Sequence, residues 1–196
     1  MGYSVRQGGA TRRRRVLGVL LAGTMLGSAA PLCAQVIFVD GDTITTPRVL
    51  TADTELRIAA GSATQSGVVS DDGNDFGIVK TGAGTLVLSG ANTYTGGTTI
   101  NAGLLVSNHV NPSPGPANID ALGSGPITLA GGALRTDVNR NGTYSQNVIF
   151  AANTSSVFSA AANLLIQIGG NLTVNAGATA TFGVAGVAGT VNVTNG

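Results

Sequence analysis

Apolar and polar residues alternate in short runs from position 35 onward, and Gly, Asn, Asp or Pro separates one run from the next. Clear examples are residues 85–89, 126–129, 146–150, 172–174 and 190–194. Because successive side chains of a strand point to opposite faces, this period of two predicts short, half-buried β-strands. In this part of the chain, no stretch of ten or more residues has the apolar spacing of an amphipathic helix. The pattern therefore predicts an all-β chain with a turn about every five to ten residues.

Internal echoes of the sequence favour a solenoid over an antiparallel sandwich, the other architecture that such strands could form. Residues 101–103 and 175–177 both read Asn-Ala-Gly and precede a strand. A Gly, a small residue and a second Gly introduce a strand at 82–88 and again at 123–129. The rungs of a solenoid need only an inward apolar residue and a corner turn, so imperfect echoes are expected. We therefore predict a β-solenoid.

The first segment has the order of a secretory signal peptide. Positions 1–15 are Arg-rich, positions 16–27 are apolar, and small residues follow. We expect cleavage after Ala34, so that the mature chain begins at Gln35. The apolar run is shorter than the roughly 20 residues that cross a bilayer, and we expect no transmembrane helix. General secretion and twin-arginine export both stay open, because residues 13–17 loosely match the twin-arginine pattern.

Composition narrows the class of function. The chain has 196 residues, of which 30 are Gly and 10% are charged. Beyond the leader, the chain has nine Asp and Glu residues and five Lys and Arg residues, so the mature chain has a net charge of about −4. The five cationic residues are Arg48, Arg57, Lys80, Arg135 and Arg140. Nucleic-acid binding needs clustered Lys and Arg, so we expect none. The only Cys, Cys33, leaves with the leader, and stability must then come from packing and backbone pairing rather than disulfides.

Residues 77–108 hold the most specific motif of the chain. Its defining positions are Lys80, Thr81, Gly82, Gly84, Leu86, Leu88, Gly90, Asn92, Tyr94, Gly96, Gly97, Thr98, Ile100 and Gly103. This segment resembles the passenger-associated transport repeat, also called the autotransporter-associated β-strand repeat, of bacterial autotransporters. Residues 121–129 resemble the strand that commonly trails such a repeat. The clear resemblance covers about a fifth of the chain.

The resemblance implies a right-handed parallel β-helix in the passenger of a type V secreted protein of a Gram-negative bacterium. Such a passenger is exported through the periplasm and reaches the cell surface or the medium. Its partners are the export machinery and an outer-membrane β-barrel translocator, which this chain lacks. Since positions 195–196 fall inside an expected rung, we expect an N-terminal fragment of a longer autotransporter. A short product that cannot reach the surface by itself is the alternative.

The expected organisation has five parts. Residues 1–34 form the signal peptide, and residues 35–76 form N-terminal strands or a cap. Residues 77–108 form the transport repeat, residues 109–121 a Pro- and Gly-rich loop, and residues 122–196 further β-helix rungs that are truncated.

Alternation also predicts which side chains of the repeat are buried. Leu86 and Leu88 are expected to face the core, because alternate residues of a strand point inward. The outward positions of the same run are Thr85, Val87 and Ser89. Ile100 and Leu105 are expected on other faces of the same or the next rung.

Few residues have the pattern of a catalytic or metal site. The acidic cluster at 71–75 offers oxygen ligands for Ca²⁺ but lacks EF-hand spacing, so we expect a solvated turn, as we do at 40–42. His109, the only His, precedes the Pro-rich segment 112–116 and is expected to be exposed without a partner. Tyr94 is expected to pack beside the Gly-Gly turn that follows it rather than stack on a ligand. We assign no catalytic residue, metal ligand or cofactor.

Three functions fit these observations. The first is a structural passenger segment whose repeat assists folding-coupled translocation across the outer membrane, without enzymatic activity. The second is an adhesin that binds a cell surface or matrix through its outer faces or the loop at 112–116. The third is a β-helical polysaccharide lyase or hydrolase, which would need two carboxylates within roughly 5 to 10 Å on one face.

Overall fold

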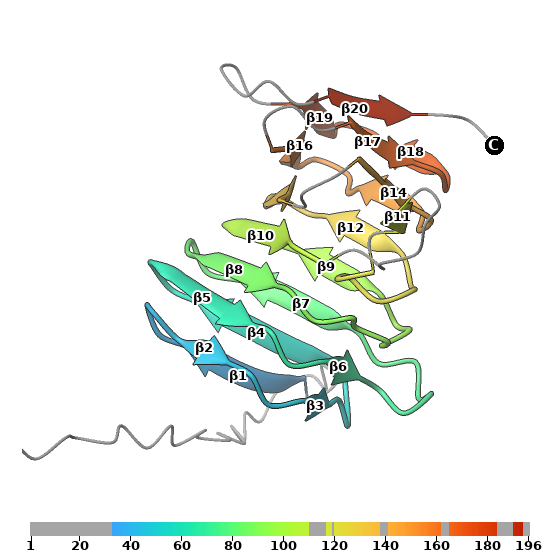
Figure 1. Ribbon diagram of the computed structural model, residues 1–196. Coiled ribbons are helices and arrows are strands. Elements are labelled where there is room, and N and C mark those ends of the chain that lie inside the picture. The colour runs from blue at the N-terminus through green and yellow to red at the C-terminus, as the bar shows by residue number, and fades with distance from the viewer. Residues whose placement is uncertain are drawn as a thin grey trace, which may run out of the picture.

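The computed structural model describes residues 33–109, 117–118, 120–137, 141–161, 165–183 and 190–193, and within these ranges every regular element is a β-strand (Figure 1). The predicted leader before Cys33 and most of the predicted loop at 109–121 lie outside the described residues. The all-β prediction is confirmed for the part of the chain that the structure describes.

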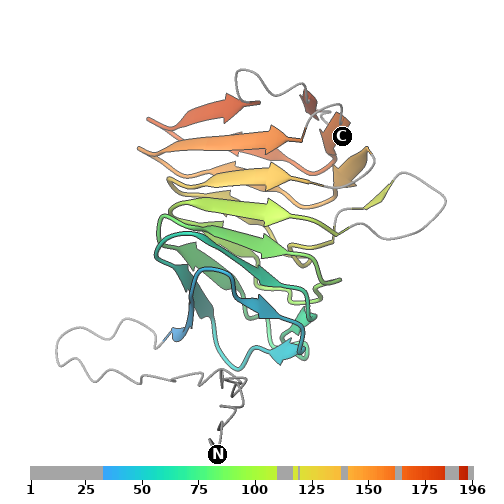
Figure 2. The same cartoon turned by 60° about the vertical axis from the view of Figure 1, so that its left-hand side comes forward.

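The strands form four parallel sheets, which build three faces around one axis (Figures 1 and 2). The first sheet has seven strands, in the order β1 (Ala34–Phe38), β4 (Thr54–Ile58), β7 (Ile78–Thr81), β9 (Thr98–Ile100), β12 (Ile127–Leu129), β15 (Val148–Phe150) and β18 (Leu172–Val174). The second also has seven, in the order β2 (Thr43–Ile44), β5 (Ser62–Gln65), β8 (Thr85–Leu88), β10 (Leu104–Ser107), β13 (Ala133–Thr136), β16 (Ser155–Ala160) and β19 (Thr179–Phe182).

The third face is built from shorter pieces. β3 (Arg48–Val49) pairs with β6 (Val69–Ser70), and a separate sheet has the order β11 (Ala117–Asn118), β14 (Gly142–Tyr144), β17 (Leu165–Ile168) and β20 (Thr190–Val193). The chain visits the first sheet, the second sheet and the third face in turn, and we call each such passage a rung. The first rung begins at β1 and the third at β7.

Register between successive rungs defines the solenoid. Ile78 pairs with Thr98, twenty residues later, and Thr98 pairs with Ile127, twenty-nine residues later. Each return brings a strand beside its predecessor in parallel, so the hydrogen bonds of one rung are completed by the next. The predicted parallel β-solenoid is confirmed. Residues 35–76 belong to the same three faces as the rest and form the first two rungs.

The core consists of inward side chains that stack along the axis. Leu86 and Leu88 are fully buried, as predicted, and Ile100 is buried in the first sheet. Leu105 is also buried, but the expectation of a different face is wrong, because Leu105 pairs in register with Leu86 in the second sheet. The cause is the length of the rung, which returns the chain to the same face.

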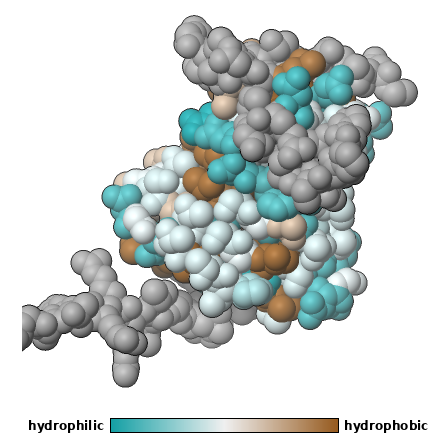
Figure 3. All heavy atoms as spheres, viewed as in Figure 1, coloured by the Kyte–Doolittle hydropathy of each residue, from teal (hydrophilic) through white to brown (hydrophobic). Residues whose placement is uncertain are grey.

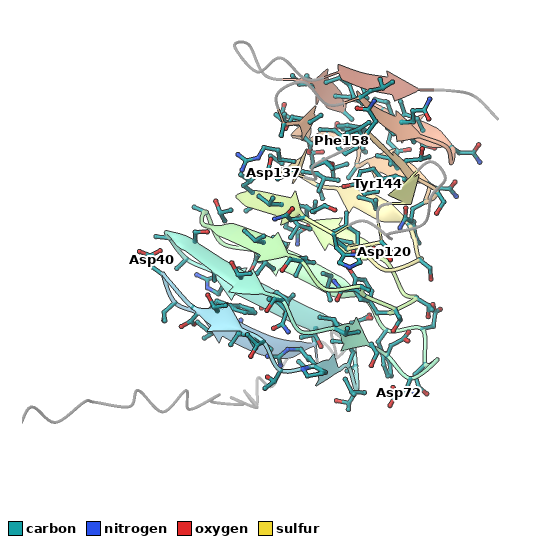
Figure 4. The ribbon with its side chains drawn as sticks, viewed as in Figure 1. Asp40, Asp72, Asp120, Asp137, Tyr144 and Phe158 are labelled. Atoms are coloured by element: carbon teal, nitrogen blue, oxygen red, sulfur yellow. The ribbon has the colours of Figure 1, made fainter. Side chains whose placement is uncertain are left out.

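Aromatic side chains fill the core of the later rungs. Tyr144 and Phe158 are fully buried with ring centroids 5.6 Å apart, and both are labelled in Figure 4. Phe158 also meets Phe182 of the next rung, at 6.4 Å between centroids and nearly perpendicular rings. Such edge-to-face pairs add to the burial of apolar area.

Every passage from the first sheet to the second turns on a residue with positive φ. These residues are Gly41, Gly61, Gly82, Gly103, Gly131, Asn153 and Gly177. A left-handed residue reverses the chain in little space, and Gly or Asn adopts that conformation at the lowest cost. The Asn-Ala-Gly echoes of the sequence are therefore corners of this one row.

The outer surface is mostly polar or composed of small residues. On the face drawn in Figure 3, the described residues are largely pale or teal, with hydrophobic residues in small groups. Within the described ranges, no helix is long and apolar enough to cross a membrane.

Candidate functional site

The predicted transport repeat occupies the middle of the solenoid. Lys80 and Thr81 lie in β7, Leu86 and Leu88 lie in β8, and Thr98 and Ile100 lie in β9. Asn92 and Tyr94 lie in the segment between β8 and β9. The motif glycines lie in the connections, at positions 82, 84, 90, 96, 97 and 103. Strands of neighbouring rungs cover the repeat on both sides, with β4 and β5 before it and β12 and β13 after it. The repeat therefore contacts both its predecessor and its successor.

Lys80 is the most unusual residue of the repeat, since it is fully buried inside the solenoid. Its ammonium donates three hydrogen bonds, to the carbonyl oxygens of Thr81 at 3.0 Å, Gly82 at 2.9 Å and Ala102 at 3.0 Å. These bonds use all three donors of the group. Burial lowers the pKa of Lys80 from 10.5 to about 8, so the amine is still mostly protonated at neutral pH.

The acceptors of Lys80 lie in two stacked corners that only glycine can build. Gly82 and Gly103 have φ of 76° and 68°. A Cβ on Gly82 would collide with the carbonyl oxygen of Ile58, and a Cβ on Gly103 would lie 2.5 Å from the carbonyl oxygen of Gly84. These two motif glycines are thus explained both by conformation and by the close approach of successive corners.

Asn92 joins three rungs with one side chain. Its Oδ1 accepts a hydrogen bond from the backbone N–H of Val69 at 2.8 Å, in the preceding rung. Its Nδ2 donates to the carbonyl oxygen of Ala121 at 2.6 Å, in the following rung. Asn92 is only 5% exposed, so both bonds form out of water, where leaving a partner unpaired is costly.

Tyr94 and Thr98 form a second buried link to the following rung. The Tyr94 hydroxyl lies 2.6 Å from Thr98 Oγ1, and Thr98 Oγ1 donates to the carbonyl oxygen of Leu122 at 3.1 Å. A Cβ on Gly123 would lie 2.8 Å from the Tyr94 ring, so that glycine leaves room for the aromatic side chain. Burial raises the pKa of Tyr94, which keeps the phenol neutral.

Asp71 corrects the prediction that the acidic cluster is only a solvated turn. Asp72 and Asp75 are exposed, but Asp71 is 2% exposed and its carboxylate accepts hydrogen bonds from Thr95 and Gly73. The Thr95 hydroxyl, at 2.7 Å, is the main cause that lowers the pKa of Asp71 to about 2. Sequence reasoning missed this anchor because Thr95 lies 24 residues later, and no local pattern pairs the two.

The same cluster bears on the enzyme alternative. Asp71 and Asp75 both contact Thr95 Oγ1, at 2.7 and 3.4 Å, so their carboxylates lie on one face. A general acid needs a raised pKa. Asp71 has a lowered pKa and its oxygens accept hydrogen bonds from Thr95 and Gly73, so Asp71 is not suited to the role of the acid.

Four aspartates from different parts of the chain lie apart from one another. Figure 4 places Asp40, Asp72, Asp120 and Asp137 in separate regions of the molecule. Asp40 caps a corner, where its Oδ1 accepts a hydrogen bond from Ser62 N–H at 2.8 Å. Among the residues that the structure describes, no group of three or more His, Cys, Asp or Glu is placed to hold a metal ion.

His109 has a partner that its sequence context did not indicate. Its Nδ1 lies 2.5 Å from Oδ1 of Asp120, and the two side chains are 27% and 33% exposed. The expectation of an exposed, unpartnered His109 is therefore wrong. The fold brings together the two ends of the segment 109–121.

The predicted cleavage point lies at the start of the first strand. Ala34 is the first residue of β1, and its N–H donates to the carbonyl oxygen of Asp53 at 2.9 Å. Gln35 donates from Nε2 to Glu55 at 2.6 Å. Cleavage after Ala34 would leave Gln35 and the rest of β1 in the sheet, and it stays a prediction.

Comparisons with known proteins agree with the resemblance drawn from the motif. The family model described as the passenger-associated-transport-repeat matches residues 78–106. The chain is 33% identical over 92 residues to a protein named adhesin BmaC autotransporter, from Brucella suis biovar 1 (strain 1330). That alignment covers 42% of this chain and 3% of the relative. No solved structure matches. The resemblance to an autotransporter passenger that carries the transport repeat is confirmed.

Proposed function

We propose that this chain is a structural passenger segment of a type V secreted surface protein, in which the transport repeat assists folding-coupled translocation across the outer membrane. The matched repeat and the autotransporter relative support this assignment. Its partners are the export machinery and an outer-membrane β-barrel translocator, and its destination is the surface of a Gram-negative cell or the medium. The segment has a mechanical rather than an enzymatic role.

The links of the repeat to both neighbouring rungs are the observation that carries the proposal. Asn92 bonds backward to Val69 and forward to Ala121, and Tyr94 bonds forward to Thr98 of the next rung. A repeat that has folded therefore presents ready-made partners to the next rung. In a solenoid, folding propagates through such nearest-neighbour interfaces.

Burial gives the process a direction. Leu86 and Leu88 are fully buried in the folded solenoid, where β5 and β10 flank β8. Each buried aliphatic side chain contributes roughly 1.5 to 3 kcal/mol. A rung that folds outside the cell would have to lose this energy to slide back through a narrow barrel, so folding would favour outward movement.

Surface display of two charge variants tests the proposal. The chain with its leader is fused to an outer-membrane β-barrel translocator, and the protease-accessible fraction on intact cells is measured. Leu88→Asp should lower that fraction several-fold, because it places a carboxylate in the core. Ala83→Asp, at an exposed corner of the same repeat, is the matched control and should display normally. Normal display and protease resistance of Leu88→Asp would refute the proposal.

An adhesin role is the second candidate, favoured by the name of the relative. The described surface exposes large apolar side chains in its first two rungs and its last; they are Ile37, Val39, Val49, Val68, Val174 and Phe182. Exposed apolar groups commonly mark interaction surfaces. Adhesion through the first rungs predicts that Ile37→Ser reduces binding of the chain to cells, whereas Val174→Ser in the last rung leaves it unchanged.

A further inference from the structure

The alternation of the repeat leaves the register between rungs undetermined. In the first sheet, Ile78 and Lys80 point inward from β7, and Thr98 and Ile100 point inward from β9. A slip of one residue would expose the inward set, so the pattern excludes it. A slip of two residues keeps every side chain on its own face. Hydrophobic patterning therefore does not discriminate against it.

Lys80 occupies a place in this stack where its neighbours are apolar. The stack reads, from rung to rung, Leu56, Lys80, Ile100, Leu129 and Phe150. All five residues are at most 1% exposed. A buried ammonium is tolerated in such surroundings only if its donors are bonded. Lys80 meets this condition through two acceptors in its own corner and one, Ala102, in the corner of the next rung.

We propose that Lys80 sets the register in which the fourth rung is added to the third. This proposal rests on the folding-coupled function proposed above. It names the residue that makes a new rung pair with the preceding rung in the native register. A two-residue slip moves the Ala102 carbonyl about 7 Å along the strand, beyond reach of the amine. The slipped rung would also place residue 101 or 105 at the corner position of Gly103. The carbonyl of residue 100 or 104 would take the place of Ala102, but residues 101 and 105 carry a Cβ, which at the Gly103 corner would collide with the carbonyl oxygens of Gly82 and Gly84. The corner therefore cannot close in the slipped state, and the buried ammonium loses its third acceptor, a penalty that an apolar residue would not impose.

Disulfide trapping measures the register directly. The full chain carries Cys33→Ser, which removes its only cysteine, and is refolded from urea under mild oxidation. Val79→Cys with Thr99→Cys reports the native register, since these residues are paired. Thr81→Cys with Thr99→Cys, and Val79→Cys with Asn101→Cys, report the two slipped registers. In the native register the slipped pairs lie about 8 Å apart, beyond the range of a disulfide.

Lys80→Met is the decisive variant, because Met fills the stack without a charge. We expect it to fold into a β-solenoid by circular dichroism and to raise the ratio of slipped to native disulfides about tenfold, equivalent to about 1.4 kcal/mol of lost discrimination. Ile100→Met places the same side chain at the next position of the stack. It retains Lys80 and should keep the ratio of the parent chain.

Three outcomes would overturn the proposal. An unchanged disulfide ratio in Lys80→Met would mean that other contacts set the register. Loss of all β-structure in Lys80→Met would mean that Lys80 supplies stability rather than register. An equal rise of the ratio in Ile100→Met would assign the effect to packing. Because refolding needs no translocator, these results stand apart from the surface-display experiment, which tests the translocation function itself.

Discussion

At the scale of single residues, the repeat combines buried polar groups with complete sets of hydrogen-bond partners. Lys80 and Asn92 are buried and each bonds to the backbone of another rung, and the buried Tyr94 hydroxyl bonds to Thr98 of the next rung. Such groups contribute specificity more than energy, since their hydrogen bonds mainly offset the loss of water. Asp71, just before the repeat, is also buried, and its carboxylate accepts a hydrogen bond from the Thr95 hydroxyl, 24 residues later.

The lowered pKa of Lys80 predicts a pH dependence. Its pKa is about 8 in the folded chain and 10.5 in the unfolded chain. Between these values the unfolded chain binds more protons, so the free energy of unfolding should rise as pH increases from about 8 to about 10. Urea unfolding across this range measures the slope. Lys80→Met should remove the rise, and an identical profile in that variant would contradict the assignment.

The opposite sign is expected above pH 10. Burial raises the pKa of Tyr94, and raises that of Tyr144 to about 12. Both phenols stay protonated in the folded chain while the unfolded chain ionises, so the free energy of unfolding should fall as pH rises above about 10. Tyr144→Phe should weaken this loss, which tyrosinate absorbance and urea unfolding can follow together.

Asp71 predicts how the free energy of unfolding changes with pH in the acid range. Its pKa is lowered from 3.8 to about 2 by Thr95, so its contribution is present above pH 4 and is lost as pH falls from about 4 to 2. Asp71→Asn should flatten the unfolding free energy over this interval. The exposed neighbour Asp72 supplies the control, and Asp72→Asn should leave the acid limb as it is.

At the scale of elements, the corners decide the spacing of the strands. The sequence predicted the turns and their glycines well, because positive φ is a local demand that Gly and Asn satisfy. It did not predict that one left-handed residue recurs at the same corner of every rung. That regularity depends on the stacking of segments twenty or more residues apart.

Substitution of two corner glycines can distinguish the cost of backbone strain from the cost of a steric collision. Gly41 and Gly103 both have positive φ, but a Cβ on Gly41 would meet no atom within 4 Å, whereas one on Gly103 would collide with backbone of the preceding corner. Gly41→Ala should lower the free energy of unfolding by about 1 to 2 kcal/mol. Gly103→Ala should cost several kcal/mol more, about the range of severe core changes. Equal losses in calorimetry or urea unfolding would contradict the crowded corner.

At the scale of the whole molecule, stability is distributed along the axis. The rungs of the repeat are covered on both sides, whereas Val174 and Phe182 in the last described rungs are 48% and 40% exposed. In a solenoid each rung depends chiefly on its nearest neighbours. The molecule should therefore open from its ends while the repeat stays folded.

Hydrogen exchange can test this gradient. Backbone amides of β8 and β10 should exchange at least about a hundredfold more slowly than those of β19, because opening β8 requires disrupting two interfaces. Mass spectrometry of the intact chain at neutral pH measures both. Uniform protection from β1 to β19 would instead indicate a single cooperative unit.

The sequence by itself determined the properties that depend on near neighbours. Alternation predicted the strands and the burial of Leu86 and Leu88, and the unbroken motif predicted the transport repeat and the parallel β-helix. These results follow because side-chain period and positive φ are local properties of the chain. The solenoid then followed from repetition.

Only the tertiary structure decided which residues meet across rungs. It placed Leu105 on Leu86, His109 beside Asp120, Thr95 beside Asp71, and Lys80 inside the core. Rung lengths vary from twenty to twenty-nine residues, so the partner of a given side chain is not fixed by its distance along the chain. Register between rungs is a collective outcome of packing and corner geometry, and the buried polar links become visible only once that register is set.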